Sequence, residues 1–253
     1  MNSQIARSSH GTRVPRGSGV IVEHLGGLVI ATVGFVGTHL LLSHPLRAPI
    51  AARTGEPAFL GLYSLVAIAT FVWLVMAYVA VPAEPPLWNA GVAVWALVTL
   101  LMLLASVLLV GSLIGNPALP RAGSPGALPT AAKGVFSITR HPMNWAFALW
   151  GVSHIAVFPT LSNFILAGSI ILLAVAGSAL QDRKKEALQS DRWLAWEAMT
   201  SFWPFGAVIT RRANLAGFGW AAPLGGLVVW LAATWAHGPL AGIAAGIWRW
   251  VAL

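Results

Sequence analysis

The chain has 253 residues, of which 57% are hydrophobic and only 9% are charged. A soluble domain of this length carries far more charge on its surface, so the composition excludes that class and favours an integral membrane protein. The net charge of +8 does not indicate nucleic-acid binding, because the basic residues lie in short segments between apolar runs. Cysteine is absent from the sequence, which excludes disulfides, thiolate metal sites and cysteine nucleophiles.

Residues 1–19 are polar and rich in serine, glycine and arginine, and we expect them to form a disordered tail. The piece VPRGS within this tail also resembles an engineered protease-cleavage linker. Apolar runs of about 20 residues, the length that spans a hydrocarbon core, then predict an all-α polytopic transmembrane bundle of about six spans. The runs are 20–42, 59–81, 88–114, 143–158 with its flanks, 161–180 and 220–236.

The predicted organisation has one transmembrane domain at 20–205 and a C-terminal part at 206–253. The C-terminal part contains the last span and a segment, 238–253, that is too short to span and is expected to lie at the interface.

The lysine and arginine residues of the loops predict the orientation in the membrane. The segments after the first, third and fifth runs are basic, whereas those after the second and fourth carry no lysine or arginine. By the positive-inside rule, the basic segments face the cytoplasm and the N-terminus faces outward. We therefore expect a multi-pass protein of the bacterial inner membrane, in contact with membrane lipid.

A charged segment at 181–205 begins with QDRKK and ends in a cluster of aromatic residues. This composition is typical of segments that lie along a membrane interface. We therefore expect Trp193, Trp196 and Trp203 to lie at the cytoplasmic interface.

The fourth run contains the residues that point most directly to chemistry. His154 lies more than two helical turns inside it, and an ionisable side chain at that depth is a functional candidate by default. Asn144, Gly151 and His154 share one helical face. Gly151 leaves room on that face either for a broad, flat group or for another helix. The alternative role for His154 is a hydrogen bond to a neighbouring helix.

The first run contains His39, which also lies inside an apolar stretch. Neutral imidazoles without nearby carboxylates can be axial ligands of a haem iron. A zinc site needs three or four ligands, often including carboxylates, and here the acidic residues lie only at the boundaries of the runs. His39 and His154 are therefore candidate haem ligands.

The triplet Arg140–His141–Pro142 stands at the start of the fourth run, and its proline suits the first turn of a helix. Two roles are open for Arg140. It either extends to the headgroups or binds an anionic group such as a phosphate or a propionate.

Three stretches resemble the NnrU family of bacterial membrane proteins: GTHLLLSHPLRAPIAARTGEPAFLGLYSLVA, TRHPMNWAFALWGVSHIAV and QDRKK. The similarity covers about residues 25–205. It implies a role in denitrification, in nitrite and nitric oxide metabolism, for a family without a settled molecular activity. The family also includes the plant 15-cis-ζ-carotene isomerase, a membrane enzyme that contains haem b.

The isomerase pattern of an arginine-histidine-proline triplet followed by tryptophan and histidine matches this chain at the same spacing, and its other haem histidine resembles His39. The resemblance implies a haem b site with His39 and His154 as metal ligands. The other residues that it implies around the cofactor are Arg140, His141, Trp150 and Gly151. Gly151 replaces an exchangeable cysteine ligand of the isomerase, which argues against the same isomerase chemistry.

The depth of the two histidines is an objection to this pair. From the rise per residue, His39 lies about 5–9 Å from the cytoplasmic boundary and His154 about 18 Å from it. Axial ligands of one iron lie level with each other, and depth alone favours His141 as the partner of His39. The specific spacing of the motif favours His154.

We therefore expect a haem b-binding membrane protein that acts as a redox or gas-responsive component, with nitric oxide or another lipid-soluble small molecule as its partner. The alternatives are a haem-dependent cis–trans isomerase of a polyene, a non-catalytic assembly factor, and a membrane methyltransferase. The methyltransferases share an Arg-His-Pro motif, but they follow it with other residues than the MNWA found here.

Overall fold

The computed structural model describes residues 16–117 and 130–251. Within these ranges the chain forms helices and no strand, which confirms the predicted all-α class. The tail predicted at 1–19 lies outside the described residues except for its last four positions, which belong to the first helix. Most of the proline-rich connector between the third and fourth runs also lies outside them.

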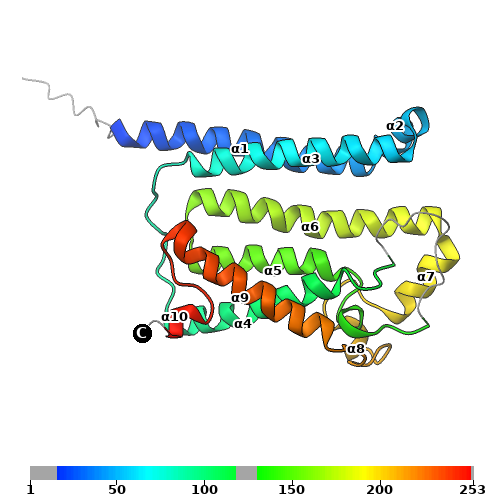
Figure 1. Ribbon diagram of the computed structural model, residues 1–253. Coiled ribbons are helices and arrows are strands. Elements are labelled where there is room, and N and C mark those ends of the chain that lie inside the picture. Colours follow the sequence, from blue (N-terminus) through cyan, green and yellow to red (C-terminus); the bar gives the residue numbers. More distant parts are fainter. Residues whose placement is uncertain (1–15, 118–129, 252–253) are drawn as a thin grey trace, which may run out of the picture.

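The described helices follow one another in chain order (Figure 1). Their bounds are α1 Arg16–Ser43, α2 Arg47–Thr54, α3 Glu56–Val79, α4 Val92–Gly111, the 3₁₀ helix η1 Gly134–Ser137, α5 Pro142–Val157, α6 Leu161–Leu188, α7 Ser190–Met199, α8 Gly206–Ile209, α9 Ala221–Ala241 and α10 Trp248–Val251.

Five of these helices are long and apolar enough to cross a membrane: α1 from Gly19, α3, α4, α6 and α9. They correspond to five of the six predicted runs. The fourth run is α5, which has only 16 residues and packs between α4 and α6. A helix needs about 20 apolar residues to span the hydrocarbon core unaided. Because α5 is shorter than this, it depends on packing between α4 and α6 for its place in the bundle.

The helices are arranged in layers. α1 and α3 pack as a hairpin, and α1 packs on α6 (Figure 1). α6 then packs on α5, α5 on α4, and α4 on α9. Glycine permits the close approach of α4 and α9, because a Cβ atom at Gly226 would lie 2.6 Å from the Cα atom of Val107. Small residues serve this purpose in membrane helix pairs.

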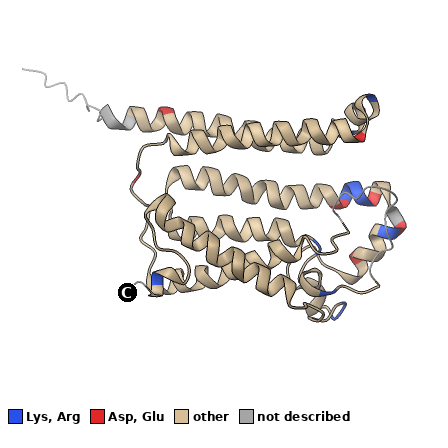
Figure 2. Ribbon diagram, in the orientation of Figure 1, with Lys and Arg blue, Asp and Glu red and all other residues tan. Residues whose placement is uncertain are grey.

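Charged residues gather at one end of the bundle. Figure 2 shows most lysines and arginines at the end that carries α2, α7 and α8, together with the end of α6. The described lysines and arginines of the three basic segments thus lie on the same side, as the loop pattern predicts. Which side of the membrane this end faces stays a prediction.

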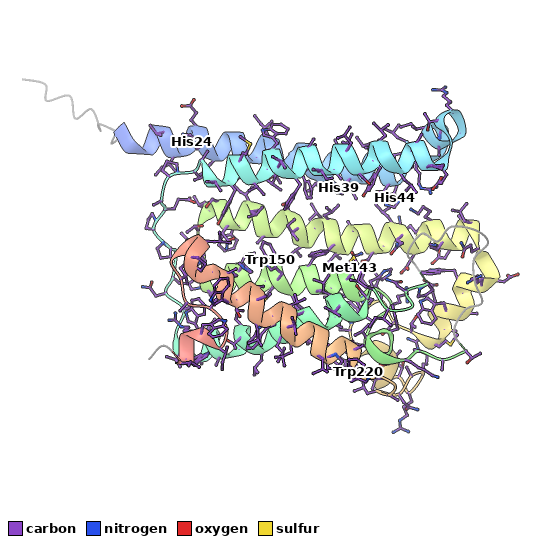
Figure 3. The ribbon with its side chains drawn as sticks, in the orientation of Figure 1. His24, His39, His44, Met143, Trp150 and Trp220 are labelled. Atoms are coloured by element: carbon purple, nitrogen blue, oxygen red, sulfur yellow. The ribbon has the colours of Figure 1, made fainter. Side chains whose placement is uncertain are left out.

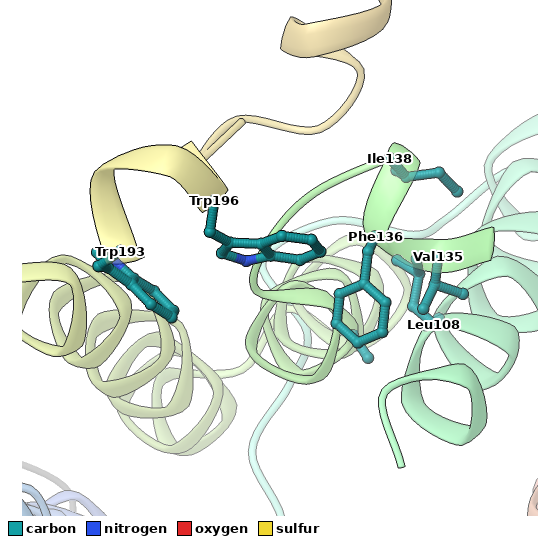
Figure 4. Packing of buried hydrophobic residues seen from close by; sticks show 8 residues of the cluster. Leu108, Val135, Phe136, Ile138, Trp193 and Trp196 are labelled. Atoms are coloured by element: carbon teal, nitrogen blue, oxygen red, sulfur yellow. The ribbon is translucent and has the colours of Figure 1, made fainter. Parts of the chain in front are cut away.

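A hydrophobic cluster at this charged end holds α7 against the bundle. Trp193 and Trp196 are each only 1% exposed and pack with residues of η1 and α4 (Figure 4). These two side chains are therefore packed inside the protein, and the location of the segment at the membrane interface stays a prediction. The chain turns back after α6, so one face of α7 becomes protein core. Trp203, at 64% exposed, is accessible at the surface.

Candidate functional site

Arg140 lies directly before α5 and connects three parts of the chain. Its Nε donates to Asp182 Oδ2 at 2.8 Å, and its Nη2 lies 2.7 Å from the same oxygen. Nη2 also lies 3.0 Å from Glu197 Oε1, on α7. The backbone N–H of Arg140 donates to the carbonyl of Ser201 at 2.9 Å. The anionic group that Arg140 binds is therefore a carboxylate of the same chain.

His141 shares this carboxylate. Its Nε2 lies 2.9 Å from Asp182 Oδ1, and its side chain is 1% exposed. Each oxygen of Asp182 thus has a basic partner, Arg140 on one side and His141 on the other. A buried carboxylate is costly unless it is paired in this way. The triplet at 140–142 therefore ties the beginning of α5 to the far end of α6, and His141 is not available as a partner of His39.

Glu197 completes the cluster from α7. Burial raises the pKa of its carboxyl group, and the neighbouring Asp182 and Glu186 raise it further, while Arg140 acts in the opposite direction. The neutral form of Glu197 is thus favoured more than for an exposed glutamate. We name the four residues Arg140, His141, Asp182 and Glu197 the ionic cluster.

His39 lies in a different place, on α1, and lines a cavity of about 580 Å³ between α1, α3, α5 and α6. Its Nδ1 is 2.9 Å from the carbonyl oxygen of Phe35, one turn earlier. Since a carbonyl can only accept, Nδ1 carries the proton and Nε2 keeps its lone pair. In this tautomer Nε2 of His39 can serve as a metal ligand.

The walls of this cavity are mainly apolar and aromatic, and one end is polar. Across from His39, the helix α5 contributes the thioether of Met143 and the ring of Phe147. Figure 3 shows His39 and Met143 at similar positions along the bundle. The polar end includes His44 and Lys184. Burial lowers the pKa of His44, and the charge of Lys184 lowers it further.

His154 is not among the residues that line this cavity. Its Nδ1 lies 2.8 Å from the carbonyl oxygen of Trp150, and the indole of Trp150 packs on its ring with centroids 4.2 Å apart. The other ring beside it belongs to His237 of α9, with centroids 6.0 Å apart. The histidine that lies level with His154 is thus His237.

Gly151 allows a close contact between two helices. A Cβ atom there would lie 2.6 Å from the side chain of Ile171 and 2.9 Å from the carbonyl oxygen of Ala167, both on α6. The small face of α5 was expected to accommodate either a broad, flat group or another helix, and in the structure it packs against the helix α6. Asn144 on the same helix donates to Ser178 Oγ of α6 at 2.7 Å.

Asp182, Glu197 and His237 were missed by sequence reasoning. Asp182 follows the fifth apolar run within the motif QDRKK, and nothing in that local pattern indicates a partner as distant as Arg140. His237 lies one residue beyond the predicted last span, which was ended too early at 236. The apolar pattern around Pro239 does not reveal that α9 continues to Ala241.

Comparison with protein families gives one match, to the family described as NnrU protein, over residues 27–245. Neither the curated proteins nor the solved structures contain a match. The family match continues through α9, well past residue 205, up to which the similarity was expected. It covers most of the chain and all the residues discussed above. The chain therefore belongs to the NnrU family.

Proposed function

We propose that this NnrU family protein binds haem b in the cavity beside His39, and that it acts in nitrite and nitric oxide metabolism as a redox or gas-responsive component. The observation that carries the proposal is the imidazole of His39, whose Nδ1 is engaged by its own helix while it lines an apolar cavity. An imidazole with its second nitrogen held by a carbonyl is the usual form of a metal-ligating histidine.

The cavity suits the cofactor in size and chemistry. Its volume of about 580 Å³ lies inside the range of about 300–1,000 Å³ for small-molecule sites. Its aromatic walls can pack on a flat macrocycle, and Lys184 at the polar end can pair with a propionate. Met143 supplies a thioether in the same wall and could hold the iron together with His39.

Haem iron supplies a site that binds nitric oxide and exchanges single electrons. The protein residues would hold the macrocycle, orient His39 through Phe35 and exclude water from the iron. The pair predicted from the sequence, His39 with His154, would require His154 in this cavity, whose wall has Met143 instead.

The absorption spectrum of protein purified in detergent, from cells supplied with a haem precursor, tests this proposal. We expect a Soret band that is lost in His39→Ala and retained in His24→Ala, a matched control on the same helix outside the cavity. Met143→Leu should change the ligation state while it keeps the band. A colourless wild-type protein would refute haem binding. Loss of the band in His154→Ala would favour the pair predicted from the sequence.

A second candidate function is the cis–trans isomerisation of a polyene, which the apolar aromatic walls of the same cavity would favour. Incubation of the haem-loaded, reduced protein with cis-carotenes tests it. An unchanged isomer ratio would contradict this candidate and leave haem binding intact.

A further inference from the structure

His154 and His237 come from different helices and meet away from the His39 cavity. Their ring centroids are 6.0 Å apart and the ring planes differ by 34°. α5 and α9 each pack on α4, so the two imidazoles connect helices that share a neighbour. Neither histidine lines the cavity beside His39. Two ionisable groups placed together within apolar helices are energetically costly, and such residues mark a functional-site candidate.

Both imidazoles leave the same nitrogen, Nε2, with a free lone pair. Nδ1 of His154 is bonded to the carbonyl of Trp150 at 2.8 Å, and Nδ1 of His237 to the carbonyl of Ala233 at 2.7 Å. Each Nδ1 must therefore carry the ring proton, which leaves the lone pair on Nε2. Within the described residues, neither Nε2 takes part in a hydrogen bond given by the structure. Such backbone bonds fix the orientation and raise the basicity of metal-binding histidines.

We propose that His154 and His237 form a metal site that binds a monovalent copper ion. Two imidazole nitrogens that bind one ion at about 2.0–2.1 Å each are separated by about 4 Å. Rings whose centroids are 6.0 Å apart can reach this arrangement. This site shares no residue with the haem cavity, so the proposal does not depend on haem binding.

The number of available ligands and the charge of the ion both favour Cu(I). Among the described residues, no group of three or more histidine, cysteine, aspartate or glutamate side chains could hold a metal. Zinc sites use four ligands, of which at least three come from the protein. Cu(I) accepts two nitrogen ligands in a linear arrangement. Its single charge also costs less to bury among apolar helices than a double charge, because the solvation penalty rises with the square of the charge.

The indole of Trp150 adds a contact suited to this ion. It packs on the His154 ring with centroids 4.2 Å apart. An aromatic face next to a bound cation attracts it, and tryptophan does so most strongly. It also covers the imidazole against water and larger ligands. A bound Cu(I) ion would quench the fluorescence of this tryptophan, one of 13 in the chain, and comparison with Trp150→Phe isolates its share of the signal.

The test is a competition for Cu(I) between the detergent-purified full-length protein and a chromogenic Cu(I) chelator, under ascorbate. We expect the wild type to withdraw one equivalent. His154→Ala and His237→Ala should each lower the affinity by more than about 100-fold, since loss of an outer-shell partner alone costs about 10–100-fold. His24→Ala, on α1 and outside the His39 cavity, is the matched control and should bind as the wild type does.

Two further measurements make the result decisive. The thermal unfolding and the gel-filtration profile of each variant show whether it is folded, and His237→Gln replaces the ring with a side chain of similar polarity. Equal copper binding by the wild type and the His154→Ala/His237→Ala double variant would overturn the proposal. So would loss of the Soret band in His237→Ala, because the pair would then ligate haem iron. A retained Soret band with lost copper binding supports two separate sites.

Discussion

Replacement of Asp182 by asparagine should destabilise the protein more than any other single change in the ionic cluster. The substitution keeps the shape of the side chain but removes the charge that Arg140 and His141 share. The side chains of Arg140 and Asp182 are 13% and 7% exposed, so the lost interaction is a buried one. Removal of one partner of a buried ion pair costs about 3–5 kcal/mol.

The lower end of this range applies, because Arg140 retains Glu197 at 3.0 Å. We therefore expect Asp182→Asn to lower the free energy of unfolding by about 3 kcal/mol. By the scaling for soluble domains of 150–250 residues, this corresponds to a decrease in Tm of about 6–12 °C. Thermal unfolding in detergent, followed by tryptophan fluorescence, measures this shift.

The matched control is Glu197→Gln, in the same cluster. Burial raises the pKa of Glu197, so its charged form is less favoured than that of an exposed glutamate. Its partner Arg140 keeps Asp182 in this variant, so we expect Glu197→Gln to remain closer to the wild-type Tm than Asp182→Asn does at neutral pH. A Tm of Asp182→Asn that equals the wild-type value, or a larger loss in Glu197→Gln than in Asp182→Asn, would refute this account of the cluster.

Two other variants and one pH profile test separate features of the structure. Gly151→Cys should destabilise the bundle by about 1–3 kcal/mol, because its Cβ would press on the Ala167 carbonyl. The control is Gly168→Ala, where a Cβ would meet open space. Equal Tm values for the two variants would contradict the close contact at Gly151. Asn163→Ala removes a side chain that donates to two carbonyls at the end of α5, and we expect a loss of about 1–3 kcal/mol in thermal unfolding; a neutral result would mean that water replaces both bonds. The raised pKa of Glu197 predicts that the wild type matches Glu197→Gln at low pH and loses stability relative to it as the pH rises above 4.5, the ordinary value; a constant difference in Tm from pH 4 to 8 would be inconsistent with this.

The long helices could be predicted because an apolar run of sufficient length has few other structures available in a membrane. A span must satisfy its backbone internally, and composition alone therefore located α1, α3, α4, α6 and α9. The common side of the basic loops was predictable for a similar reason, since charge is excluded from the apolar layer. The 16-residue α5 was found only together with its flanks, because its boundaries depend on the proline at its first position and on packing.

The site could be predicted only in part, because pairing between distant residues leaves no local pattern. Arg140, His141 and His154 were all singled out, but Asp182 lies 42 residues after Arg140, and His237, the neighbour of His154, belongs to a helix much later in the chain. The burial of Trp193 and Trp196 was missed for a related reason. An aromatic, charged helix has the same composition whether it lies on a membrane or folds back against its own bundle.

The N-terminal hairpin of α1 and α3 meets the rest of the bundle through the contact of α1 with α6. The cavity beside His39 lies at this contact, with one wall in the hairpin and the other on α5 and α6. During synthesis the hairpin emerges first, and the second wall is complete only after the ribosome has added residues up to Leu188. Any ligand of this cavity must therefore enter after most of the chain has been inserted. Its contacts would then stabilise the packing of the hairpin, which is made early, against α5 and α6, which are made later.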